Sequence, residues 1–206
     1  MTDRRFDALL CDLDGVLRHW DTTSPPRLER AYGLPAGALT SAAFRPDRLV
    51  PAVTGQVTDE EWRAAVAADL APACGTPERA RALVEAWSDT PGSVDPVVLA
   101  MLTEVRRRVP VVLVTNATTR LESDLAALGL TEVADAIVNS ARVRVAKPDP
   151  EIFRIAAERA GVPTGRCLFV DDTEGHVTAA RELGMTAVWH RDNAELRRVL
   201  RPLIDV

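Results

Sequence analysis

The sequence predicts an α/β protein: a parallel sheet covered by helices, with a small helical domain inserted after the first strand. From about Val94 onward, short β-branched runs alternate with amphipathic helical patterns, which is typical of a parallel sheet with helices on both faces. The apolar run Ala8–Leu13 indicates one more buried strand near the N-terminus. About eighty residues without a strand pattern separate it from the later series.

The alternating series defines the remaining elements of the predicted sheet. Its strands are Val111–Thr115, Ala136–Asn139, Cys167–Asp171 and Thr186–Trp189. Amphipathic stretches near 96–108, 118–128, 150–160 and 175–183 alternate with them. Because strand–helix–strand units place successive strands in parallel, we expect these helices to cover both faces of one sheet.

The intervening region reads as helices broken by proline and glycine. Within residues 27–88, Thr58 followed by Glu61 forms a capping-box pattern that predicts the start of one helix. Pro77 indicates the start of another, at a position where proline is tolerated. The flanks 22–26 and 88–96 have the composition of linkers. We therefore expect a core domain at residues 1–17 and 92–206, and a cap domain at residues 18–91.

Composition excludes several classes of protein. With 206 residues, 47% hydrophobic and 27% charged residues, the chain reads as a soluble globular protein. Its net charge of −5 argues against nucleic-acid binding, and no apolar run approaches the length of a membrane span. Three isolated cysteines and the lack of a signal-peptide pattern favour a reducing cytoplasm. Composition leaves open whether the protein is a monomer or a homodimer.

Two of the predicted strands end in pairs of acids. Asp12 and Asp14 follow the first strand, and Asp171 and Asp172 close a later one. Ligands of open α/β sheets bind beyond the carboxyl ends of the strands, so both pairs fall where a site is expected. An unpaired carboxylate is costly to bury. These acids therefore indicate either a bound cation or direct use in chemistry.

Two further segments place polar groups beside the same edge. Thr115 and Asn116 end another strand, and Lys147 precedes a predicted helix. Taken singly, the first pair could cap a helix and the lysine could be solvated. Taken together with the acids, they supply a nucleophile, a metal site, a phosphate-binding hydroxyl and a cation.

These segments resemble the haloacid dehalogenase-like (HAD) hydrolase superfamily, in the subfamily with a helical cap. The resemblance covers the whole core and keeps the order of the motifs. The matching segments are Asp12-Leu13-Asp14-Gly15-Val16, Thr115-Asn116, Lys147-Pro148-Asp149-Pro150 and Val170-Asp171-Asp172. The resemblance implies a Rossmann-like sheet of strand order 5-4-1-2-3 and a cap inserted after strand 1.

The resemblance also implies roles for the catalytic and phosphate-binding residues. Asp12 would be the nucleophile that forms an aspartyl-phosphate, which splits one difficult displacement into two steps. Asp14 would be the general acid/base. Thr115, Asn116 and Lys147 would bind the phosphate, with the ammonium offsetting its charge.

A Mg²⁺ site follows from the same resemblance. Asp12 and Asp172 would supply carboxylate ligands, with the backbone carbonyl of Asp14 as another. Asp171 would bind directly or through water. Such an all-oxygen set is what Mg²⁺ prefers, and the ion would allow a phosphate to approach a carboxylate.

The resulting hypothesis is a Mg²⁺-dependent phosphatase acting on a small phosphorylated metabolite. Asp14 argues against a dehalogenase, which has no leaving alcohol to protonate. A phosphomutase of the β-phosphoglucomutase type shares all four motifs and stays open. A non-catalytic binding or regulatory module is disfavoured because the motifs are intact.

Some positions near the motifs are left open by the sequence. His176 stands where the subfamily commonly has Asn, and we interpret it as an indirect contributor rather than a catalytic histidine. Side chains just after the first motif and in the cap could either contact the substrate or pack and be solvated elsewhere. They are Arg18, His19, Trp20, Arg45 and Arg48.

Overall fold

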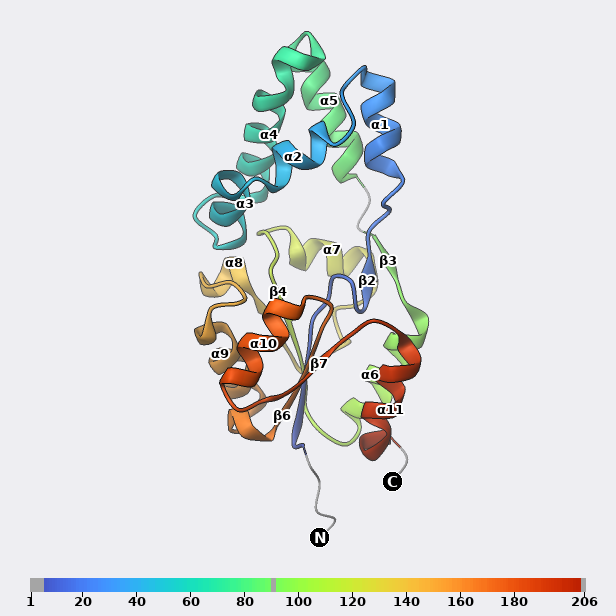
Figure 1. The fold of residues 1–206 in the computed structure, drawn as a ribbon, viewed down its shortest axis with the longest axis vertical. Helices are drawn as coiled ribbons and strands as arrows, with labels where there is room; N and C mark the ends of the chain where they lie inside the picture. Colours follow the sequence, from blue (N-terminus) through green and yellow to red (C-terminus); the bar gives the residue numbers. More distant parts are fainter. Residues whose placement is uncertain (1–5, 90–91, 205–206) are drawn as a thin grey trace.

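The structure, a computed structural model, describes residues 6–89 and 92–204. Its core is a five-stranded parallel sheet in the order β5-β4-β1-β6-β7 (Figure 1). The strands are β1 (Ala8–Cys11), β4 (Val111–Thr115), β5 (Ala136–Asn139), β6 (Cys167–Asp171) and β7 (Thr186–Trp189). Numbered within this sheet and followed from β7, the order is 5-4-1-2-3, so the expectation is confirmed.

Helices cover both faces of the sheet. One face packs against α6 (Pro96–Arg106), α7 (Leu121–Ala127) and α11 (Asn193–Ile204). The other packs against α9 (Pro150–Ala160) and α10 (Glu174–Glu182). Short turns of helix, α8 (Ser140–Val143) and η1 (Thr164–Arg166), complete this part of the chain. With both faces covered, the strands are predominantly apolar, which is why the sequence marks them so clearly.

Five helices form a separate layer above the carboxyl ends of the strands (Figure 1). They pack around their own apolar cluster, which includes Leu39, Trp62 and Leu83. The helices are α1 (Ser24–Tyr32), α2 (Ala38–Phe44), α3 (Pro46–Val53), α4 (Asp59–Cys74) and α5 (Pro77–Ser88). We call this layer the cap. No helix in the described part of the chain combines the length and apolarity needed to cross a membrane.

A short antiparallel ribbon, which the sequence did not predict, joins the cap to the core. It pairs β2 (Arg18–His19) with β3 (Ser93–Val94). The sequence also assigned residues 22–26 to a linker, whereas α1 already begins at Ser24. Its two prolines lie in the first turn of the helix, where a missing N–H costs no hydrogen bond.

The start of α4 sits directly on the core. Thr58 and Glu61 form the predicted capping box. Asp59, which follows Thr58, contacts the core through two hydrogen bonds. Its Oδ1 accepts from Thr118 Oγ1 at 2.7 Å, and its backbone N–H donates to Thr119 Oγ1 at 2.9 Å. The loop that follows β4 in the core is thus hydrogen-bonded to the first turn of α4 in the cap.

Glu29 is a buried acid that closes the N-terminus of α2, and it provides a test of cap packing. Its two carboxylate oxygens accept hydrogen bonds from the N–H groups of Gly37 and Leu39, each at 2.9 Å. Glu29→Gln turns one acceptor into a donor facing an N–H, and we expect a loss of about 1–3 kcal/mol in the free energy of unfolding. Urea denaturation measures it, with the exposed Glu78→Gln as the control. Equal stability of the two variants would contradict this assignment.

Candidate active site

A buried ammonium lies between two strand-end carboxylates. Lys147 Nζ is 2.8 Å from Asp12 Oδ1, at the end of β1, and donates to Asp171 Oδ2 at 2.6 Å, at the end of β6. All three side chains are almost fully buried. The N–H of Leu13 also donates to Asp12 Oδ1, at 2.7 Å. Because β1 and β6 are adjacent parallel strands, the fold itself brings these two acids together.

These charges shift one another's pKa values. Burial raises the pKa of Asp12 to about 8, against the lowering effect of Lys147 and with the help of the Asp171 charge. Burial also opposes ionisation of Asp171 and Lys147. Hydrogen bonds from His176 and Lys147 nevertheless lower the pKa of Asp171, and the two carboxylates raise the pKa of Lys147. The lysine is therefore held as a cation inside the site.

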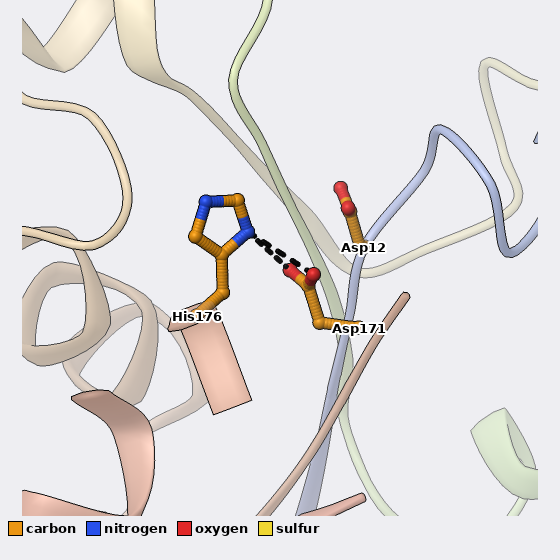
Figure 2. A group of neighbouring side chains, drawn as sticks. All are labelled: Asp12, Asp171 and His176. Atoms are coloured by element: carbon orange, nitrogen blue, oxygen red, sulfur yellow. Dashed lines mark hydrogen bonds and ion pairs between the residues drawn. The ribbon is translucent and has the colours of Figure 1, made fainter. Parts of the chain in front are cut away.

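His176 lies beside Asp171, as Figure 2 shows. Its Nδ1 is 3.1 and 3.2 Å from the two carboxylate oxygens. The N–H of Thr173 donates to Asp171 Oδ1 at 2.8 Å. Together with the bond from Lys147, these contacts occupy both carboxylate oxygens of Asp171. Asp171 therefore positions the side chains of Lys147 and His176. A carboxylate oxygen of Asp12, one of Asp171 and a ring nitrogen of His176 lie within 4.8 Å of one another, close enough to bind the same metal ion.

The end of β4 contributes an amide and a hydroxyl with different surroundings. The side chain of Asn116 accepts from the N–H of Lys147 and donates to its carbonyl, each at 2.8 Å. It therefore fixes the backbone that carries the lysine. Thr115 Oγ1 is buried and has no hydrogen-bond partner among the described residues. A buried hydroxyl without a partner is costly, and a bound oxyanion would satisfy it.

Asp14 is held by an arginine four residues further along. Arg18 Nε and Nη2 donate to its two carboxylate oxygens at 2.6 and 2.9 Å, a bidentate ion pair. Arg18 is only 2% exposed, and its Nη1 also reaches Asp124 on α7 at 3.4 Å. The guanidinium lies 4.4 Å from the ring centroid of Trp20. Arg18 is thus buried rather than solvated, and it lines a space between the cap and the core.

Asp172 lies against the turn at Gly15. A Cβ at Gly15 would be 1.9 Å from Asp172 Oδ2, and Gly15 has a φ of +82°. Only glycine fits both conditions, because an L side chain would be strained and would collide with the carboxylate. Asp172 itself is exposed, with one oxygen 3.3 Å from Thr173 Oγ1. Its carboxylate is therefore open to a ligand.

The predicted site residues come together around one hollow of about 440 Å³. Its lining includes Asp12, Asp14, Thr115, Asn116, Lys147, Asp172 and His176. Asp171 is not part of this lining and contacts it through Lys147. Asp14 is balanced by Arg18. Lys147 pairs with Asp12 and Asp171, and no ion pair among the described residues involves Asp172, so the hollow carries surplus negative charge.

Comparison with known proteins places this geometry in a family. Residues 6–184 match the family profile described as haloacid dehalogenase-like hydrolase. The chain belongs to the haloacid dehalogenase-like hydrolases.

Similar relatives of this HAD hydrolase include named phosphatases. It is 29% identical over 195 residues to the fructose-1-phosphate phosphatase YqaB of Escherichia coli, covering 89% of this chain and 96% of that protein. It is 36% identical over 125 residues to a phosphoserine phosphatase of Thermus thermophilus, covering 58% of this chain and half of the relative. A HAD family enzyme of Bacteroides thetaiotaomicron, solved with magnesium and inorganic phosphate, shares the fold with a TM-score of 0.72 at 21% identity. The match covers 93% of this chain and 98% of that one.

The two cap arginines considered from the sequence lie away from this HAD site. Arg48 donates to Asp69 at 2.8 and 3.0 Å, and Arg45 pairs with Asp47 and Asp69 on the cap surface. Both are thus bound to acids of the cap. His19, by contrast, lines the hollow and approaches Asp95 at 3.7 Å, and Trp20 lines it while 46% exposed.

The buried charge cluster generates a stability prediction. Lys147→Met leaves Asp12 and Asp171 buried without their shared cation, and we expect a loss of about 3–5 kcal/mol in the free energy of unfolding at pH 7. The exposed pair Arg81–Glu78 provides the control, since Arg81→Met should leave stability unchanged within error. Chemical denaturation of both variants checks the difference. A Lys147→Met protein as stable as Arg81→Met would show that the lysine does not compensate these acids.

Proposed function

We propose that this HAD hydrolase is a Mg²⁺-dependent phosphatase that hydrolyses a small phosphorylated metabolite through an aspartyl-phosphate on Asp12. The observation that carries the proposal is the hollow in which Asp12, the ammonium of Lys147 and the unpartnered hydroxyl of Thr115 meet. A nucleophile, a counter-charge and an oxyanion donor are what phosphoryl transfer requires. The named relatives support this reaction class.

The residues present fit a magnesium ion. Asp12, Asp172 and the backbone carbonyl of Asp14 would hold it, an oxygen set that Mg²⁺ prefers. Asp171 would contribute through water or through its hold on Lys147 and His176. The surplus of carboxylates over ammonium means that a dianionic phosphate could enter only with a further cation. When bound, the ion supplies charge neutralisation and favours the ionised form of Asp12.

The first chemical step falls to Asp12. A carboxylate oxygen attacks phosphorus, and the bond between phosphorus and the leaving oxygen breaks. Lys147 Nζ lies 2.8 Å from the attacking carboxylate and offsets the charge that builds between the nucleophile and the phosphate. Thr115 Oγ1 donates to a phosphate oxygen. Asn116 keeps the lysine in place through its two backbone contacts.

Asp14 completes the reaction as acid and then as base. It gives a proton to the leaving alcohol, and afterwards takes one from the water that attacks phosphorus and frees Asp12. Arg18 holds both oxygens of the ionised carboxylate, so one of these two contacts must be given up while Asp14 carries the proton. An alcohol leaving group needs a proton from Asp14, whereas a halide does not. The presence of Asp14 therefore favours a phosphatase over a dehalogenase.

We also propose a partner, a cellular compartment and a domain division for this enzyme. Its partner is a small phosphate ester rather than a nucleic acid, in keeping with the net charge of −5. Cys11, Cys74 and Cys167 are all free and buried, which suits a reducing cytoplasm. We assign residues 18–91 to the cap domain that covers the site, and residues 1–17 and 92–206 to the core domain.

Replacing the nucleophile tests the reaction directly. Asp12→Asn keeps the shape of the side chain but removes the carboxylate, so Mg²⁺-dependent hydrolysis of p-nitrophenyl phosphate should fall to background. EDTA should abolish turnover by the unchanged enzyme, and added Mg²⁺ should restore it. Undiminished turnover in Asp12→Asn, or turnover indifferent to EDTA, would overturn the mechanism. Phosphate transferred to a sugar rather than to water would favour a phosphomutase.

Gly15 offers a test of Asp172 as a metal ligand. In Gly15→Ala the new Cβ pushes Asp172 away, and the Mg²⁺ concentration for half-maximal activity should rise about 10- to 100-fold. Gly184→Ala is the matched control, because Gly184 has nearly the same φ, +80°, but no atom within 4 Å of the added Cβ. If both variants keep the normal Mg²⁺ requirement, Asp172 does not hold the ion.

A further inference from the structure

A second cavity lies between the cap and the core, next to the hollow around Asp12. It has a volume of about 480 Å³, within the usual range for small-molecule sites. Asp14, Trp20, Thr22 and Asn116 line both spaces, so the two adjoin. A phosphoryl group at Asp12 would therefore extend its alcohol portion into this cavity. The lining of the cavity then decides which alcohol fits.

The cap side of the cavity is aromatic and predominantly apolar. Phe44 lies edge-on to Trp87, with ring centroids 5.9 Å apart, and Trp62 lies 5.8 Å from Trp87 and 6.5 Å from Phe44. Phe44 is 51% exposed, although it belongs to this cluster. A large apolar side chain left open beside a cavity offers surface that an apolar ligand would cover. Trp20 adds a further half-exposed ring at the junction with the phosphate hollow.

The cations of the cavity are already paired. Arg18 is held by Asp14 and Asp124, as described above. Arg63 Nε is 2.6 Å from Asp59 Oδ2, and Arg120 Nε donates to Asp124 Oδ1 at 2.8 Å. Among the described residues of the lining, each arginine thus has a carboxylate partner. A second anionic group on a substrate would therefore have to compete with these carboxylates for an arginine.

Acids outnumber these arginines in the lining. The acids are Asp14, Asp21, Glu29, Asp59 and Asp124, against three arginines. A carboxylate or second phosphate entering the cavity would lose its hydration and face this negative surplus without a cation. That cost is large for a desolvated charge. An uncharged group would instead gain from contact with the aromatic cluster.

We propose that the substrate is a phosphate monoester of an uncharged, predominantly apolar alcohol, whose ring or hydrocarbon portion packs against Phe44, Trp62 and Trp87. Esters that carry a second negative charge are rejected. The inference rests on the phosphatase function proposed above and specifies its substrate class. The named relatives do not supply it, because phosphoserine carries a carboxylate and fructose 1-phosphate a polar sugar.

A matched pair of esters isolates the effect of charge. 2-Phenylethyl phosphate and 2-(4-carboxyphenyl)ethyl phosphate share a primary-alcohol leaving group and differ by one distant carboxylate. We expect kcat/KM to be about tenfold or more higher for the uncharged ester. It should also exceed kcat/KM for glycerol 3-phosphate and phosphoserine. Equal values within the pair, or a preference for phosphoserine, would overturn the proposal.

Two variants of the cavity should each weaken one part of this preference, the apolar part and the charge part. Phe44→Ala removes part of the aromatic surface and should lower the ratio of kcat/KM for 2-phenylethyl phosphate over glycerol 3-phosphate. Thr40→Lys adds an unpaired cation to the lining and should raise turnover of the carboxylated ester relative to the uncharged one. Val97→Ala, another exposed apolar side chain but on α6 outside the cavity, should change neither ratio.

A binding measurement separates this inference from the phosphatase proposal. In Asp12→Asn, the tryptophans of the cavity report occupation through their fluorescence, without turnover. 2-Phenylethyl phosphate should change this fluorescence at a concentration about tenfold or more below that needed by its carboxylated partner. If no ester is hydrolysed but this difference is found, the phosphatase proposal fails and the cavity assignment stands. If esters are hydrolysed and no difference is found, the cavity assignment fails alone.

Discussion

Two carboxylates at adjacent strand ends, Asp12 directly after β1 and Asp171 at the end of β6, can be buried side by side because the ammonium of Lys147 lies between them. The rest of the site is arranged around this charge. Asn116 holds the backbone that carries the lysine, and His176 completes the contacts of Asp171. The arrangement still leaves more negative than positive charge, since one ammonium cannot balance every acid at this edge. This surplus is the reason for which we propose that a divalent cation accompanies the phosphate.

The sheet and the identity of the site residues could be predicted because both leave strong local signals. Strands buried on both faces are continuous apolar runs, and β4, β5, β6 and β7 begin and end where the sequence places them. Acids directly after such runs stand out, because a buried strand has no structural use for them. Parallel strands bring their carboxyl ends to one edge, so residues far apart in sequence were expected to meet.

What could not be predicted depends on contacts rather than on pattern. The β2–β3 ribbon has two residues in each strand, too few for any periodicity. The ion pair of Arg18 with Asp14 requires the turn at Gly15 to bring the two side chains face to face. His176 could be read only as a departure from a motif, since its contact with Asp171 arises from how α10 meets the end of β6. The ion pair between each arginine of the cavity and its carboxylate likewise depends on the folded structure, and no sequence pattern predicts it.

The β2–β3 ribbon has a consequence for how the cap and the chemistry are connected. Arg18 is at once a ribbon residue that leads into the cap and the residue that grips Asp14. Its other contact, Asp124, is shared with Arg120, which reaches the last helix of the cap through the carbonyl of Ser88. A change in the position of the cap would therefore reach Asp14, the acid/base that we propose, through these ion pairs. Because Arg18 belongs to the ribbon and also holds both oxygens of Asp14, the connection to the cap and the orientation of Asp14 depend on the same side chain.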